Sequence, residues 1–260
     1  MTYCLAIKVD EGLVFASDSR TNAGVDNIST YSKMHNFSWP GNRSFVLLSS
    51  GNLATTQAVV RRIRADAEGA VNPSLQTISD INAAANYVGK ISTDIQRAQA
   101  ERGTAGSNFE ATFIFGGQIA GQAPAIFLIY PQGNYIHEST EYPFLQMGET
   151  KYGKPILDRV IRSNTQLELA GRCALVSINS TIRSNLTVGP PVELLMYKKD
   201  SLGEGRHMVL TEHDPYYRGL SDAWSEGIRH ALNGLPPFEW EYEHKTVQLV
   251  QGAAPSQTMG

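Results

Sequence analysis

The chain has 260 residues, 42% hydrophobic and 18% charged, so it is long enough for one large domain and apolar enough to bury a sizeable core. A formal net charge of −3 and a pI near 6.1 argue against a nucleic-acid-binding protein, which usually carries a basic stripe. The sequence shows no secretory signal pattern and no apolar run near the ~20 residues of a membrane span. We therefore expect a cytoplasmic protein that binds neither nucleic acid nor membrane.

Short strands joined by tight turns are predicted for the first fifty residues. Tyr3 to Val9 is apolar at nearly every position, as in a strand covered on both faces, and Leu13 to Ser17 returns antiparallel. A loop at Thr21 to Asn27 precedes a strand at about Ser29 to Trp39, and another strand follows at Ser44 to Ser49. We expect these four strands to form one antiparallel sheet.

Helices and strands alternate in blocks along the rest of the chain. Two helices are predicted at about Leu53 to Ala67 and Ser79 to Gly103, because apolar residues recur every three or four positions. Strands, two helices, closing strands and a last helix follow, at residues 111–115, 125–130, 135–138 and 144–147, then 155–163 and 165–185, then 192–197 and 207–210, then 220–232. This order predicts an α+β fold, a four-layer αββα sandwich of two antiparallel sheets flanked by helix pairs. We expect a single domain over 2–240 and a tail over 241–260.

The start of the chain carries the sharpest chemical feature. Thr2 follows Met1, and a small second residue permits removal of the initiator methionine. Thr2 would then carry a hydroxyl and a free α-amine, and an amine that titrates at about 7.7–8 can take the proton from the hydroxyl. Many proteins begin Met-Thr, so the surrounding residues decide whether Thr2 is a nucleophile.

Three residues near Thr2 in the predicted sheet strengthen that interpretation. A buried Lys33 beside the amine would lower the amine's pKa by like-charge repulsion, and Asp18 would keep the lysine charged. Taken alone, each residue fits a structural role better, Asp18 as an edge carboxylate and Lys33 as a snorkelling strand lysine. Gly51 joins a core strand to a helix, where it is either a plain turn glycine or an accessible N–H donor for an oxyanion.

Thr2, Asp18, Lys33 and Gly51, at these spacings and in this strand order, resemble the catalytic set of proteasome β-subunits. Within that family the chain is most similar to the bacterial subgroup called Anbu, the ancestral β-subunit. Three segments carry this likeness, ASDSRTNAG at 16–24, MGETKYGKP at 147–155 and STIRSNLTVGPP at 180–191. The resemblance covers about residues 2 to 240.

The resemblance implies a threonine peptidase of the N-terminal nucleophile type, which cleaves an amide bond through an acyl ester and uses no metal or organic cofactor. Thr2 would be the nucleophile and its amine the base, with Lys33 modulating the amine's pKa, Asp18 holding the lysine and the Gly51 N–H binding the oxyanion. Peptide or protein substrates and assembly into a multi-subunit homo-oligomer are also implied.

Two segments depart from the family pattern. Proteasome subunits usually place a serine in a Gly-Ser-Gly turn near the nucleophile, where this chain has Glu149. They also place an aspartate and a serine three residues apart after the next helix pair. Here that region offers Asn179, Thr181 and Ser184, without a carboxylate, and Ser184 is the candidate for the serine role.

Two other functions stay open on the sequence. The first is an N-terminal nucleophile amidohydrolase for a small amide, which shares these residues and differs only in pocket and access. The second is an assembly component with weak or no catalysis. The missing carboxylate near Ser184 favours this second function, while the presence of both Asp18 and Lys33 opposes it.

Several remaining motifs favour structural roles. Residues 148–155 come within one residue of a phosphate-binding loop, but a proline stands where a serine or threonine would hold Mg²⁺, as at an ordinary first helical turn. His207 and the segment 212–214 match no strong metal-site template and indicate a solvated loop. Cys4 and Cys173 lie far apart in apolar stretches, which predicts small buried hydrophobes rather than a disulfide.

Overall fold

The computed structural model describes residues 1–22, 28–103 and 107–241, and the chain divides into two compact units, Met1–Arg218 and a second that begins at Gly219. Twelve strands are formed in the described residues: β1 Tyr3–Val9, β2 Gly12–Asp18, β3 Arg20–Asn22, β4 Ile28–Thr30, β5 Met34–Trp39, β6 Arg43–Gly51, β7 Ala111–Ile119, β8 Ala125–Ile129, β9 Tyr135–His137, β10 Phe144–Gly148, β11 Val192–Lys198 and β12 Arg206–Leu210. They make two five-stranded sheets, β10-β1-β2-β11-β12 and β5-β6-β7-β8-β9, and a short ribbon of β3 and β4.

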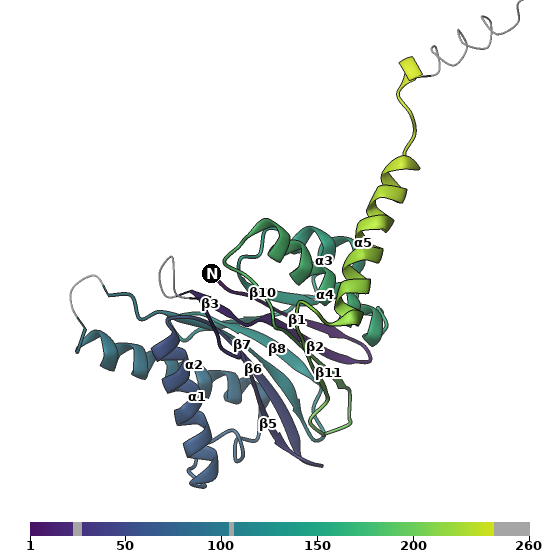
Figure 1. The fold of residues 1–260 in the computed structure, drawn as a ribbon. Helices are drawn as coiled ribbons and strands as arrows, with labels where there is room; N and C mark the ends of the chain where they lie inside the picture. Colours follow the sequence, from purple (N-terminus) through teal and green to yellow (C-terminus); the bar gives the residue numbers. More distant parts are fainter. Residues whose placement is uncertain (23–27, 104–106, 242–260) are drawn as a thin grey trace, which may run out of the picture. The chain divides into compact units, whose positions relative to one another are not determined.

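Helix pairs cover the outer faces of the two stacked sheets in the first unit. Helices α1 (Leu53–Glu68) and α2 (Ile81–Ala100) lie against the sheet that contains β6 and β7, and α3 (Lys154–Val160) and α4 (Leu167–Ser184) lie against the sheet that contains β1 and β2 (Figure 1). One core fills the space between α1, α2 and their sheet, and a second core fills the space between the sheets. The four-layer αββα sandwich is therefore confirmed.

Strand β1 is covered on both faces, as its apolar run predicts. Cys4 and Ala6 belong to the core between the sheets. Tyr3 faces the opposite side, where its hydroxyl lies 2.7 Å from the Ser177 hydroxyl of α4. Cys4 and Cys173 are both buried and unpaired, also as predicted. The residue just before β1 is consequently held at the edge of a rigid layer.

The prediction that the first four strands form one sheet is wrong. Strands β1 and β2 pair in one sheet, while β5 and β6 pair in the other. The predicted strand at Ser29 to Trp39 is interrupted at residues 31–33, where the chain crosses between the sheets. The Tyr31 N–H donates to the Ser19 carbonyl at 3.0 Å, and the Ser49 N–H donates to the Lys33 carbonyl at 2.9 Å. Apolar alternation identifies strands but not the edge on which each strand pairs.

Smaller differences occur at the predicted loop and at the tail. The loop expected at Thr21 to Asn27 starts within β3, and residues 23–27 lie outside the described part of the chain. Helix α5 (Pro215–Asn233) starts earlier than predicted. Residues 242–260 of the predicted tail lie outside the described residues.

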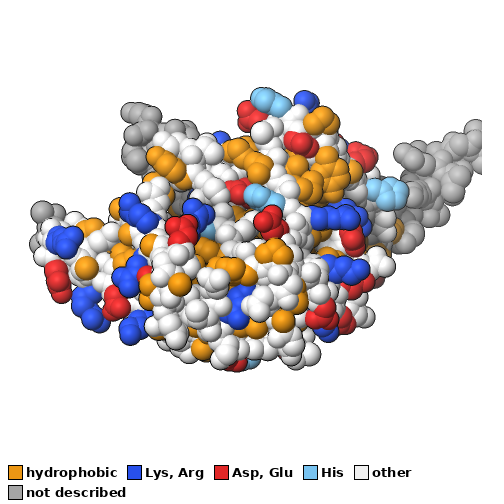
Figure 2. Space-filling view, turned by 90° about the horizontal axis from the view of Figure 1, so that it is seen from below, with side chains coloured by type: hydrophobic (Ala, Val, Ile, Leu, Met, Phe, Trp, Pro, Cys, Tyr) orange, Lys and Arg blue, Asp and Glu red, His pale blue; other side chains and the backbone are white. Residues whose placement is uncertain are grey.

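The molecular surface carries charges of both signs. In Figure 2, Lys and Arg side chains stand beside Asp and Glu side chains on the face shown, as expected for a formal net charge of −3. Among the described residues, no helix has the length and apolar character needed to span a bilayer.

Candidate active site

A buried ion pair joins the end of β2 to the crossing between the sheets. The Lys33 ammonium donates to Asp18 Oδ1 at 2.6 Å and to the Arg20 carbonyl at 2.7 Å. Asp18 is fully buried and Lys33 is only 6% exposed. Burial raises the pKa of the Asp18 carboxyl, and Lys33 opposes this by stabilising the ionised form. The predicted pairing of Asp18 with Lys33 is therefore present in the structure.

Backbone groups hold the Asp18 carboxylate in place. The Tyr3 N–H donates to its Oδ1 at 3.0 Å, and the Gly189 N–H donates to its Oδ2 at 3.3 Å. Because Tyr3 directly follows Thr2, the same carboxylate fixes both the lysine and the backbone of the candidate nucleophile.

Thr2 is partly buried at the start of β1, where β10 holds its backbone. The Glu149 N–H donates to the Thr2 carbonyl at 2.8 Å, and Gly148 pairs with Tyr3 across the strands. Gly148 has φ +83°, and a Cβ there would lie 1.9 Å from the Thr2 carbonyl oxygen. Only glycine fits so close to the Thr2 backbone.

The amine at the site belongs to Met1, which still precedes Thr2 in the described chain. Its pKa is lowered mainly by burial and then by the positive charge of Lys33, while Asp18 and Glu149 act in the opposite direction.

Gly51 ends β6 one residue before the N-cap of α1. Its φ is +111°, and a Cβ would lie 2.4 Å from the Glu110 carbonyl oxygen. Asn52 caps the helix by accepting the Thr55 N–H at 3.1 Å. The predicted strand-to-helix turn is confirmed, and it presents the positive end of the helix dipole toward the site.

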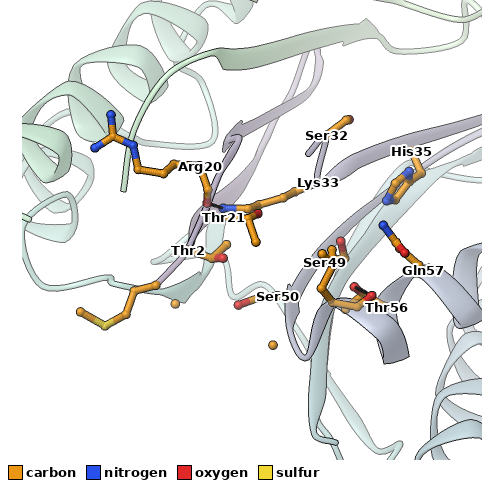
Figure 3. Close-up of a pocket in the computed structure, with 14 residues that line it drawn as sticks. Thr2, Arg20, Thr21, Ser32, Lys33, His35, Ser49, Ser50, Thr56 and Gln57 are labelled. Atoms are coloured by element: carbon orange, nitrogen blue, oxygen red, sulfur yellow. Dashed lines mark hydrogen bonds between the residues drawn. The ribbon is translucent and has the colours of Figure 1, made fainter. Parts of the chain in front are cut away.

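A cavity of about 390 Å³ opens beside Thr2, Lys33 and Gly51. Its walls are Met1, Thr2, Arg20, Thr21, Ser32, Lys33, His35, Ser49, Ser50, Gly51, Leu53, Thr56, Gln57 and Gly148. Figure 3 shows Thr2 and Lys33 on one side and Ser49, Thr56, His35 and Gln57 opposite them. The Arg20 side chain points away and donates to the Leu186 carbonyl at 2.7 Å.

Sequence reasoning missed the wall opposite Thr2. His35 comes from β5 and Gln57 from the first turns of α1, and both line the cavity. Burial, with a smaller effect of Arg64, lowers the pKa of His35 to about 4, so its ring is neutral near pH 7. The position of Gln57 shortly after the Gly51 turn was the only available signal.

The candidates on α4 occupy different places. Ser184 is exposed at the end of the helix and does not line the cavity. Burial raises the pKa of the Tyr217 hydroxyl, and the Asn179 side chain opposes this. The Thr181 hydroxyl donates to the Ser177 carbonyl at 3.0 Å. Asn179 and Thr181 therefore interact with neighbouring residues of the helical layer and do not line the cavity.

Asn185, next to Ser184, was not predicted to contribute to the site. Its Nδ2 donates to Glu149 Oε2 at 2.9 Å, and its Oδ1 accepts the Thr187 N–H at 3.0 Å and the Thr187 hydroxyl at 2.6 Å. The Asn-x-Thr spacing favours such a turn and was the signal available in the sequence.

The motifs assigned structural roles fit the fold in most respects. The segment 148–155 leads into α3 with its proline in the first turn, as predicted. His207 lies in β12, as the strand predicted at 207–210 requires, and its Nε2 lies 3.1 Å from the buried Glu193 carboxylate, which the solvated-loop interpretation did not predict.

Comparisons with known proteins agree with this geometry. Residues 2–195 match the family model described as proteasome subunit. Anbu from Yersinia bercovieri has a TM-score of 0.87 and 41% identity, over 92% of this chain and 99% of that one. A Pseudomonas aeruginosa structure titled a helical assembly of the Anbu complex has a TM-score of 0.88 and 44% identity, over 93% and 100% of the two chains. Anbu from Hyphomicrobium sp. strain MC1 has a TM-score of 0.82 and 44% identity, over 92% and 100%. A search of curated proteins gave no match.

Because the family model covers most of the chain, the chain belongs to the proteasome subunit family. Its fold is the N-terminal nucleophile hydrolase fold that the Anbu structures share.

Proposed function

We propose that the chain is a threonine-type N-terminal nucleophile hydrolase that cleaves amide bonds after Met1 is removed. One observation carries this function: the buried Asp18–Lys33 pair lies beside a cavity that Thr2 and Gly51 also line. A buried ion pair is costly unless it is well satisfied, so its position beside a candidate nucleophile favours a catalytic role.

The reaction proceeds in two halves. The Thr2 amine takes the proton from Oγ as Oγ attacks the amide carbon, and the Gly51 N–H stabilises the oxyanion. The proton passes to the leaving amine as the C–N bond breaks, which leaves an ester on Thr2. Water, deprotonated by the same amine, then attacks the ester and releases the carboxylic acid and free Thr2.

Lys33 and Asp18 support this chemistry through charge. The ammonium near the amine disfavours a second positive charge, so the amine is a free base at a lower pH. Asp18 fixes Lys33 at 2.6 Å and keeps its charge compensated. Ser184, exposed at the end of α4 and outside the cavity wall, takes no step in this mechanism.

The cavity walls favour a substrate with a neutral, hydrogen-bonding side chain. Lys33 is paired with Asp18, the Arg20 guanidinium is turned away, and most other wall groups are hydroxyls or amides. We expect a peptide with glutamine next to the cleaved bond to react about tenfold faster than its norleucine analogue, since a few hydrogen bonds are worth roughly 1–2 kcal/mol. Gln57→Leu should remove this preference, and a wild-type preference for norleucine would contradict it.

The nucleophile is tested by the intact mass of the protein after treatment with a β-lactone inhibitor. In the wild type we expect the mass of one methionine to be lost and the mass of one inhibitor to be gained. Thr2→Ala should gain no inhibitor. A chain whose Met1 is removed but which forms no adduct would contradict it. Cleavage of an unfolded protein rather than of small amides separates a peptidase from an amidohydrolase.

A second candidate function is that of an assembly component with little or no catalysis. The exposed position of Ser184 favours it, because the family's serine near the amine is then missing. Self-association is proposed in either case, since a relative is described as a helical assembly. An assembled particle that never forms the Thr2 adduct would favour this second function.

A further inference from the structure

Glu149 is a buried carboxylate tied to the backbone of the nucleophile. It directly follows β10 and is 6% exposed. Its N–H donates to the Thr2 carbonyl at 2.8 Å, and the preceding Gly148 cannot move closer or accept a side chain. The backbone of Glu149 is therefore fixed relative to Thr2.

The partners of the Glu149 carboxylate compensate its charge only in part. Asn185 donates a neutral N–H to Oε2 at 2.9 Å, and the Asn185 amide is oriented by its own bonds to Thr187. Lys151 lies 3.3 Å from Oε1, but its side chain is 67% exposed and solvent screens the pair. A buried carboxylate with this surplus of negative charge attracts a nearby cation.

The charged groups around the N-terminal amine come from three segments. Lys33 comes from the crossing between the sheets, Asp18 ends β2, and Glu149 directly follows β10. Arg20 and His35 line the same cavity, with the Arg20 side chain turned away. Among these groups, Glu149 is the carboxylate that has no buried cation as its partner.

We propose that Glu149 is a positioning residue for the α-amine of Thr2, with its carboxylate acting as the counter-charge opposite Lys33 and Asn185 fixing that carboxylate. The inference rests on the proposed function, because the amine is the base of that reaction. It also accounts for the carboxylate missing near Ser184: the negative charge comes from the turn after β10 instead of from the end of α4.

Opposite charges near the amine act in opposite directions. Lys33 favours the free base, whereas a carboxylate such as Glu149 favours the ammonium. For the Met1 amine, burial and then Lys33 lower the pKa, while Asp18 and then Glu149 raise it. Removal of the Glu149 charge will therefore let the amine lose its proton at a lower pH.

The test measures the protonation of the Thr2 amine directly. The full chain is prepared with Thr2 as its first residue by cleavage of a leader, and the ¹³C-dimethylated amine is titrated by NMR. We expect Glu149→Gln to lower the titration midpoint by about one pH unit, and Glu149→Asp to restore part of the difference. Lys151→Gln, a change on the solvent side of the same carboxylate, is the matched control and should leave the midpoint nearly unchanged.

The rate of β-lactone adduct formation against pH is the second readout. For Glu149→Gln its rising limb should move to lower pH by the same amount, together with a lower plateau. A lower plateau with an unchanged limb, or an unchanged NMR midpoint, would overturn the inference and leave Thr2 as nucleophile intact. A shifted NMR midpoint in a protein that forms no adduct would instead count against the proposed function.

Discussion

Asp18 is the residue on which the site depends most. It is fully buried, and its two oxygens accept Lys33 and the backbone N–H groups of Tyr3 and Gly189. A buried charge without its partner is far more costly than the pair. Substitution of one partner should therefore affect both folding stability and catalysis.

Lys33→Met tests this dependence. We expect a loss of about 3–5 kcal/mol in the free energy of unfolding, because the Asp18 carboxylate remains buried without its cation. Adduct formation should fall about 100-fold or more, because the amine loses the nearby positive charge that lowers its pKa. Urea unfolding and adduct rates measure the two effects.

Lys154→Met is the matched control. Lys154 pairs with Asp158 at 2.7 Å on an exposed helical surface, where such a pair contributes less than about 1 kcal/mol. Equal losses of stability in the Lys33 and Lys154 variants would contradict a special role of the buried pair.

His35 gives a pH-dependent stability. Its pKa falls from 6.5 to about 4 in the folded chain, chiefly through burial, so the unfolded chain binds more protons between these values. The contribution of neutral His35 to the free energy of unfolding is therefore fully present above about pH 6.5 and is lost as the pH falls toward 4. We expect a loss of roughly 2–3 kcal/mol after allowance for partial exposure. Urea unfolding at pH 7.5 and 4.5 should show it in the wild type and much less in His35→Gln.

The turn between β6 and α1 carries the proposed oxyanion donor, the Gly51 N–H. Gly51→Ala forces a Cβ to within 2.4 Å of the Glu110 carbonyl at φ +111°, so the turn must shift. We expect a loss of about 2–4 kcal/mol in stability and at least a tenfold slower adduct formation. Gly41→Ala is the control, since φ is +76° there and nothing lies within 4 Å of the added atom. If both variants lose the same stability, the close approach at Gly51 has no effect.

At the scale of elements, sequence periodicity predicted nearly every helix and strand and the αββα order. It did not predict the pairing of the first strands, because the break at residues 31–33 depends on long-range backbone hydrogen bonds, one accepted by the Ser19 carbonyl just after β2 and one donated by the Ser49 N–H in β6. The Asp18–Lys33 pair was predicted from residue type and spacing. The cavity wall at His35 and Gln57, and the contact of Asn185 with Glu149, are long-range contacts that carry little local signal.

The whole molecule is expected to assemble with copies of itself. One relative with a TM-score of 0.88 is described as a helical assembly. Sedimentation at micromolar concentration should give particles several times heavier than the 28.5 kDa chain. Thr2→Ala should assemble equally well, because the role proposed for the hydroxyl is chemical rather than structural. A wild type that stays monomeric would contradict self-association.

The central claim is that Thr2 carries the acyl group. Tandem mass spectrometry of the N-terminal peptide, after rapid quenching with an activated peptide ester, tests it most directly. The proposed mechanism predicts an acyl group on the Thr2 side chain of a chain that has lost Met1, and none in Thr2→Ala or at other hydroxyls of the cavity. An acyl group on Ser49, Ser50 or Thr56, or an unmodified Thr2 with a free amine, would contradict it.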